Sequence, residues 1–168
     1  SSNQWNSGNG YVVNGATGTI EWLYLGGFGY ALGLADTNND DVPEIIGLDN
    51  GFVTIYDGAF HSPLTQFMPS QNGDIAAMLV TDIEADGHAE IIIGDGQWGK
   101  IRCFNAETQQ PIWEIDNPDH GVTNIATGDP DGDGTQEVFW GAGATTSGAD
   151  RLYFFNETTL QEEYRSTD

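Results

Sequence analysis

An acidic segment recurs three times along the chain, and this repeat constrains the fold more than any other feature. The copies are Asp36–Glu44, Asp82–Glu90 and Asp129–Glu137, and their first aspartates lie 46 and then 47 residues apart. Each copy carries acids or amides at alternate positions and then a glutamate. Self-similarity at a period of 20–50 residues is typical of solenoids and propellers. The sequence therefore predicts an array of similar units.

Apolar runs flank every acidic segment. The runs before it are Ala31–Ala35, Ala77–Thr81 and Val122–Thr127. The runs after it end in glycine and are Ile45–Gly47, Ile91–Gly94 and Val138–Gly141. Short runs rich in Val and Ile, bounded by turn residues, are strand signals. Each unit is thus predicted to begin as strand, acidic loop, strand.

A second mark recurs later in the unit. Asn14, Asn105 and Asn156 each have Thr three residues on and an aromatic residue eight residues on, whereas Asp57 stands at this place without either partner. The strands predicted before the mark are Tyr11–Val13, Val53–Tyr56, Ile101–Phe104 and Leu152–Phe155. Those predicted after it are Ile20–Trp22, Ile112–Ile115 and Leu160–Tyr164. Each unit therefore contains four strands.

Four strands in about 45 residues match one blade of a β-propeller. We predict an all-β fold of four-stranded antiparallel blades, with almost no helix. The boundaries are 1–27 for a partial blade and 28–73, 74–120 and 121–168 for complete blades. Because about three and a half blades cannot close a ring, the remaining blades are expected either in the same longer chain or in neighbouring subunits.

The acidic segments are candidate calcium loops. Oxygen atoms at positions 1, 3 and 5 of a tight loop converge with the carbonyl at position 7, and such hard ligands suit Ca²⁺. Here Glu at position 9 is predicted to complete the site. The candidate ligands are Asp36, Asn38, Asp40, Val42 and Glu44; Asp82, Glu84, Asp86, His88 and Glu90; and Asp129, Asp131, Asp133, Thr135 and Glu137. The alternative is a set of hairpin turns without metal.

The three loops differ in how well they fit this pattern. The third matches every position, including Gly134 at position 6. The first has Asp41 at position 6, which predicts a left-handed backbone there. The second has Glu84 at position 3, one methylene longer than Asp. Up to three calcium sites are predicted, with the third the best formed.

Charge favours a cationic ligand and disfavours several partners. The net charge is −22, from 26 acids and 4 bases. Nucleic acid and anionic membranes are poor partners for such a surface, and no apolar run approaches the roughly 20 residues of a membrane span. Because extracellular calcium modules bind at about 10⁻⁴–10⁻³ M, we expect a secreted protein.

These residues resemble the FG-GAP/VCBS repeats of integrin-α-like β-propellers. Phe28-Gly29 resembles the "FG" element, Gly141–Gly143 approximates "GAP", and the D-x-D-x-D-G-x-x-E core is clearest at Asp129–Glu137. The resemblance implies a seven- or eight-bladed ring that serves adhesion, ligand binding or assembly. It also leaves open a propeller within a carbohydrate-active enzyme, such as a polysaccharide lyase, or a self-assembling structural protein.

The remaining polar residues do not match a catalytic or phosphate-binding motif. No nucleophile elbow or phosphate loop is present, and His61, His88 and His120 share no ligand spacing. We therefore predict a non-enzymatic module. Trp5 and Trp98, in glycine-rich loops, are candidates for stacking on a glycan, and a protein ligand is the other partner expected. Cys103, in an apolar run, is predicted to be a core residue.

Overall fold

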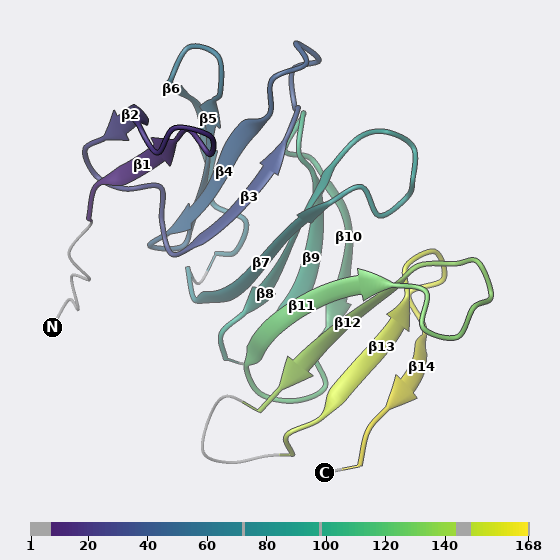
Figure 1. Cartoon of the computed structure of the whole chain (residues 1–168). Helices are drawn as coiled ribbons and strands as arrows, with labels where there is room; N and C mark the ends of the chain where they lie inside the picture. Colours follow the sequence, from purple (N-terminus) through teal and green to yellow (C-terminus); the bar gives the residue numbers. More distant parts are fainter. Residues whose placement is uncertain (1–7, 72, 98, 144–148, 168) are drawn as a thin grey trace, which may run out of the picture.

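The regular structure of the described residues consists of β-sheets. The computed structural model describes residues 8–71, 73–97, 99–143 and 149–167, and every regular element within these ranges is a strand. The fourteen strands form one two-stranded and three four-stranded sheets, which lie side by side (Figure 1). Trp5 and Trp98 lie outside the described residues. No helix that could cross a membrane occurs in the described ranges.

The three complete sheets share one topology, in which each strand pairs antiparallel with the next along the chain. The first blade holds β3 (Ala31–Ala35), β4 (Glu44–Asp49), β5 (Phe52–Asp57) and β6 (Ser62–Phe67). The second holds β7 (Ile75–Thr81), β8 (Glu90–Asp95), β9 (Lys100–Asn105) and β10 (Pro111–Asp116). The third holds β11 (Val122–Gly128), β12 (Glu137–Ala142), β13 (Leu152–Asn156) and β14 (Glu162–Arg165). The prediction of four-stranded antiparallel blades is confirmed.

The two-stranded sheet corresponds to the second half of a blade. It consists of β1 (Gly10–Val13) and β2 (Ile20–Tyr24), joined by the turn at Asn14. Asn14 holds the same place in this hairpin as Asn105 between β9 and β10 and Asn156 between β13 and β14. Strands β1 and β2 are therefore the third and fourth strands of a partial blade.

The predicted Asn/Thr mark forms a specific turn. The Asn Oδ1 accepts the backbone N–H three residues on, at 3.0 Å in Thr17, 2.8 Å in Thr108 and 2.9 Å in Thr159. The backbone carbonyl of the Asn accepts the N–H four residues on, which for Asn156 is Leu160 at 2.9 Å. Leu160 has a φ of 55°. The prediction of a strand beginning at Leu160 is wrong, because this turn requires a left-handed residue there and β14 begins at Glu162.

Asp57 forms the same turn in the first blade although it lacks the Thr and aromatic partners. Its Oδ1 accepts the N–H of Phe60, and its carbonyl accepts the N–H of His61 at 3.0 Å. His61 has a φ of 57°. A carboxylate oxygen replaces the amide oxygen as acceptor, so strand β6 follows this turn, as the four-stranded unit predicts.

The hydrophobic core lies between blades, and each junction has its own cluster. The clusters are centred on Trp22, Phe28 and Tyr56; on Ile46, Ile55 and Ile91; and on Ile92, Cys103 and Trp140. Cys103 is fully buried, as predicted. Each blade is thus stabilised chiefly by its neighbours, as in other repeat folds.

The first strands of successive blades approach closely. Strand β3 contacts β7, and β7 contacts β11 (Figure 1). Gly33 on β3 makes this approach possible, because a Cβ there would overlap the side chain of Val80 on β7. The acidic loops, which follow these first strands, are therefore brought to the same end of neighbouring blades.

Candidate metal centre

Each acidic segment forms the loop between the first and second strands of a blade. Residues 36–43 join β3 to β4, residues 82–89 join β7 to β8, and residues 129–136 join β11 to β12. The loops therefore occupy equivalent places, as the repeat predicts.

Backbone N–H groups hold the first aspartate of each loop in the same orientation. The first aspartate accepts the N–H of position 6, at 2.9 Å from Asp41 to Asp36, 2.9 Å from Gly87 to Asp82, and 3.0 Å from Gly134 to Asp129. The aspartate at position 5 likewise accepts the N–H of position 7, which belongs to Val42, His88 or Thr135. These bonds hold the carboxylates before any ion binds. They also lower the pKa of Asp36, although desolvation acts in the opposite direction.

Position 6 has a left-handed backbone in all three loops. The φ values are 66° at Asp41, 91° at Gly87 and 91° at Gly134. This agrees with the conformation expected for Asp41. Asp41 therefore carries backbone strain that glycine avoids at the other two positions.

Replacing Asp41 by glycine is expected to raise the free energy of unfolding by about 0.5–1 kcal/mol, because relief of this strain exceeds the entropic cost of glycine. Chemical denaturation with urea measures the change. The matched control is Gly134→Ala, which should destabilise the chain, since the added Cβ meets no atom but the φ is unfavourable. Destabilisation by Asp41→Gly would mean that the Asp41 side chain makes a net favourable contribution.

The glutamate at position 9 begins the second strand of each blade and is buried in all three cases. Relative exposure is 0% for Glu44, 1% for Glu90 and 1% for Glu137. A buried carboxylate is costly unless it has hydrogen-bond donors or a cation beside it. The surroundings of these three glutamates therefore distinguish the loops.

Glu44 has protein donors on both oxygens. The Thr37 N–H and hydroxyl donate to Oε2 at 2.7 and 2.8 Å, and the Asn38 amide donates to Oε1 at 3.1 Å. Thr37 was not among the predicted site residues. In this loop the side chain of Asn38, a predicted metal ligand, donates a hydrogen bond directly to the buried glutamate.

Glu90 has one such donor, the N–H of Ile83 at 3.0 Å. Burial, together with the charges of Glu84, Asp86 and Asp82, raises its pKa to about 7, although the Ile83 bond acts to lower it. Glu84 is exposed and does not replace the missing donors. The buried glutamate of the second loop therefore accepts fewer hydrogen bonds than Glu44 of the first loop.

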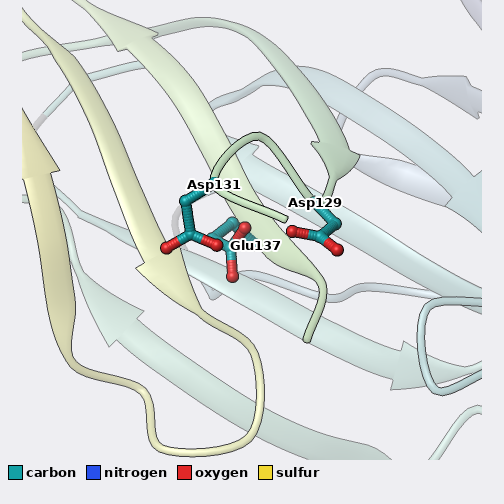
Figure 2. A group of neighbouring side chains, drawn as sticks. All are labelled: Asp129, Asp131 and Glu137. Carbon is teal, nitrogen blue, oxygen red and sulfur yellow. The ribbon is translucent and has the colours of Figure 1, made fainter. Parts of the chain in front are cut away.

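Neither carboxylate oxygen of Glu137 has a hydrogen-bond partner. Burial raises its pKa to about 7, and the charges of Glu163, Asp131, Asp133 and Asp129 add to this effect. One oxygen each of Asp129, Asp131 and Glu137 lies within 4.8 Å of the others. Figure 2 shows Asp129 and Asp131 projecting from the loop on either side of Glu137.

This group fits a hard divalent cation. The three carboxylates lie close together, and one of them is buried without a hydrogen-bond partner. They supply the negative oxygen ligands that Ca²⁺ takes. Within the described ranges, no other set of three His, Cys, Asp or Glu residues meets this spacing. Asp133, a predicted ligand, is not in the group, and its Oδ1 accepts the Thr135 N–H at 2.7 Å.

Without calcium, stability is expected to fall as pH rises. The folded-state pKa values of Glu90 and Glu137, about 7, exceed the ordinary value of 4.5. Between about pH 4.5 and pH 7 the unfolded chain loses protons that the folded chain keeps. The contribution of Glu90 and Glu137 to the free energy of unfolding therefore falls over this range and is constant above it. Melting curves in EDTA at about pH 5 and pH 8 measure the slope. The double variant Glu90→Gln/Glu137→Gln should show a smaller change of melting temperature with pH. An unchanged pH dependence would contradict the raised pKa values of these two glutamates.

Comparison with known proteins identifies the architecture. No protein-family model and no curated protein matches the chain. Among solved structures, Saccharomyces cerevisiae Sqt1 aligns over 80% of this chain and 33% of its own, with a TM-score of 0.53 and 17% identity. The Dos1 propeller aligns over 88% of this chain and 39% of its own, with a TM-score of 0.54 and 15% identity. The chain spans less than two fifths of either protein. The chain therefore has a β-propeller fold, and its described residues form three four-stranded blades and a two-stranded sheet in the place of the third and fourth strands of another.

Proposed function

We propose that the chain is a calcium-stabilised β-propeller module that serves adhesion, ligand binding or assembly outside the cell. The observation that carries this proposal is the buried Glu137 carboxylate, which has no donor and lies beside Asp129 and Asp131. A bound Ca²⁺ would neutralise these charges and join the loop to the start of strand β12. Its role is structural, because binding only to the folded state stabilises that state.

The three loops are proposed to bind calcium unequally. The third binds most tightly, through Asp129, Asp131 and Glu137. The second binds more weakly, because Glu90 already accepts one N–H bond and Glu84 is exposed. The first needs no ion, because Thr37 and Asn38 already donate to Glu44. Isothermal titration of chelator-treated protein should therefore show one dominant site per chain.

The interaction role rests on the fold and on the resemblance of the acidic loops to FG-GAP/VCBS repeats. Propeller blades present many loops on a rigid scaffold, which suits recognition of a protein or a glycan. We propose a secreted location because extracellular calcium modules typically bind at about 10⁻⁴–10⁻³ M, which requires a compartment where calcium is plentiful.

Glu137→Gln is expected to change stability in opposite directions with and without calcium. In EDTA the variant should be more stable by roughly 1–3 kcal/mol, since a neutral amide replaces a buried unpaired charge and can donate to Asp129 or Asp131. With calcium it should lose the stabilisation that the wild type gains. Urea denaturation in both buffers, with calcium titration of each protein, makes the measurement.

Glu44→Gln is the matched control, since Glu44 holds the equivalent position but has its own donors. This change should destabilise the chain by about 1 kcal/mol and leave calcium binding intact. If Glu137→Gln still bound calcium like the wild type, or if it were destabilised in EDTA, the proposed site would be wrong.

A further inference from the structure

A groove lies at the junction of the second and third blades. Its cavity volume is about 470 Å³, within the roughly 300–1,000 Å³ of ligand-binding pockets. The lining comes from three segments and includes Glu84 of the second acidic loop, Ile112 and Trp113 of β10, and Glu157 and Leu160 of the turn between β13 and β14. Both blades have all four strands among the described residues, so the groove does not depend on the partial blade.

The floor of the groove is apolar and held in place by the core. Trp113 and Leu160 pack against the core cluster of this junction, and Trp113 remains partly exposed. The register of β10 shifts between Pro111 and Trp113, and Ile112 at this irregularity is 41% exposed. An aromatic ring that the core already holds loses little freedom when a ligand binds to it.

The ring of Trp113 has no stacking partner, although the equivalent tryptophan has one. Trp22 and Trp113 both stand eight residues after the asparagine of their turn. The His61 imidazole lies flat on Trp22, with 4.8 Å between the ring centroids and 8° between the planes. Within the described ranges, no aromatic ring contacts Trp113. Tryptophan at this position therefore receives a flat nitrogen-containing group in one junction and lacks such a group in the other.

Two carboxylates border the groove, one from each blade, and neither has a cationic partner. Glu84 is exposed and Glu157 is partly exposed. Among the residues that the structure describes, no ion pair includes either glutamate. The indole N–H of Trp113, which is buried without a hydrogen-bond partner, donates to neither of them. Oε1 of Glu157 accepts the Thr158 hydroxyl at 2.7 Å, which leaves its second oxygen available to a ligand.

The negative potential of both glutamates reaches the junction beneath the groove. Burial raises the pKa of the Cys103 thiol, and the charges of Glu90, Glu84 and Glu157 add to this effect. Because Glu84 and Glu157 belong to different blades, their fields overlap between the blades. A cation that binds in the groove would interact favourably with both, and the net charge of −22 favours its approach.

We propose that the groove binds an arginine side chain from a basic segment of a partner protein. The guanidinium stacks on Trp113 and donates hydrogen bonds to Glu84 and Glu157. The aliphatic stem of the arginine lies against Ile112 and Leu160. This inference deepens the protein-binding role proposed above and rests on it, but it does not rest on calcium.

The chemistry of the lining favours arginine over two other ligands. A guanidinium is flat, stacks on aromatic faces and keeps its N–H donors in the plane of the group, where they reach carboxylates at its edge. A lysine ammonium is a compact point charge and does not combine stacking with in-plane hydrogen bonds. A neutral sugar would stack on Trp113 but would leave Glu84 and Glu157 without a cation.

The probe for the test is a fluorescent peptide, Gly-Ser-Arg-Gly-Ser-Arg-Gly-Ser, titrated with the whole chain in EDTA. Salt at about 0.15 M screens the general charge of the surface. Anisotropy should show saturable binding at or below millimolar concentration, and the same peptide with lysine in place of arginine should bind at least about threefold more weakly. The indole NMR signal of Trp113 should shift during the titration, whereas that of Trp22, which His61 covers, should not.

Glu84→Gln and Glu157→Gln should each weaken binding about two- to fivefold, the range for exposed ion pairs, and the double variant roughly tenfold. Both side chains lie at the surface, so these variants should fold normally. The matched control is Glu107→Gln. It removes the same charge from the turn between β9 and β10, outside the groove, and should bind the peptide like the wild type.

The proposal is overturned if the arginine peptide does not bind, if the lysine peptide binds equally well, or if the Trp113 signal does not move. It is also overturned if Glu107→Gln weakens binding as much as the double variant. A shift of the Trp113 signal with cellohexaose, but not with the peptide, would assign the groove to a glycan instead. Failure of the calcium proposal is a separate result, because Glu137→Gln should lose calcium and keep the peptide, whereas Glu157→Gln should keep calcium and bind the peptide more weakly.

Discussion

Removal of calcium is expected to lower the melting temperature of the chain by about 5–10 °C. At a calcium concentration about 100 times the dissociation constant, one site that exists only in the folded state adds about 2.7 kcal/mol. For a chain of this size each kilocalorie corresponds to roughly 2–4 °C. The source of the effect is the third loop, where Glu137 is buried without a partner.

The measurement is a thermal melt by circular dichroism in EDTA, repeated after calcium is restored in excess. Magnesium at the same concentration is the ionic control. It prefers a stricter octahedral site and keeps its waters, so it should restore less of the lost stability. Equal recovery with magnesium would indicate general screening of the charge of −22 rather than a specific site. No change in melting temperature with EDTA would remove the structural role of calcium.

Trp140→Ala is expected to destabilise the chain by about 3–5 kcal/mol, the range for removal of a buried tryptophan. Trp140 is 1% exposed and belongs to the cluster between the second and third blades. Its ring stacks on Tyr153 and Phe155, with centroids 5.7 and 5.0 Å away. Its Nε1–H donates to Asn117 Oδ1 at 3.0 Å, so the change also leaves a buried acceptor without this donor.

Trp140→Phe separates packing from hydrogen bonding. It keeps an aromatic ring and loses the Asn117 bond, and should cost about 1–2 kcal/mol. Urea denaturation of both variants supplies the values. If Trp140→Ala cost less than Trp140→Phe, the junction between these blades would not be a principal source of stability.

The blade pattern could be predicted from the sequence because it repeats. Three acidic loops and the Asn/Thr marks placed most of the strands, including β3 at Ala31–Ala35, and they predicted the left-handed backbone at Asp41. The turn at Asp57 could not be predicted in the same way. Its geometry depends on one acceptor oxygen and on a left-handed fourth residue, and neither requires the Thr or aromatic partners that define the pattern.

The differences between the acidic loops could not be predicted from spacing. Glu44 and Glu137 hold the same position in the repeat and are equally buried. Only Glu44 has side-chain donors, and one of them, Thr37, stands at a loop position with no role in the ligand pattern. The spacing of the acidic residues shows which oxygen atoms are available to bind a metal. Whether a carboxylate is already satisfied depends on three-dimensional contacts.

Leu32 and Leu34 of β3 are a different case. Their spacing of two residues is that expected of a strand with one buried face, so the sequence indicates core positions. In the structure they are 58% and 64% exposed, because the described part of the neighbouring sheet has only the strands β1 and β2.

The most direct test of the central claim is a crystal structure determined in millimolar calcium, with anomalous scattering to identify the ion. The account predicts a calcium ion in the third loop, with oxygens of Asp129, Asp131 and Glu137 at about 2.3–2.6 Å. It also predicts none beside Glu44, where Thr37 and Asn38 keep their hydrogen bonds. An ordered third loop that holds no ion, with Glu137 bonded to a protein donor instead, would contradict it.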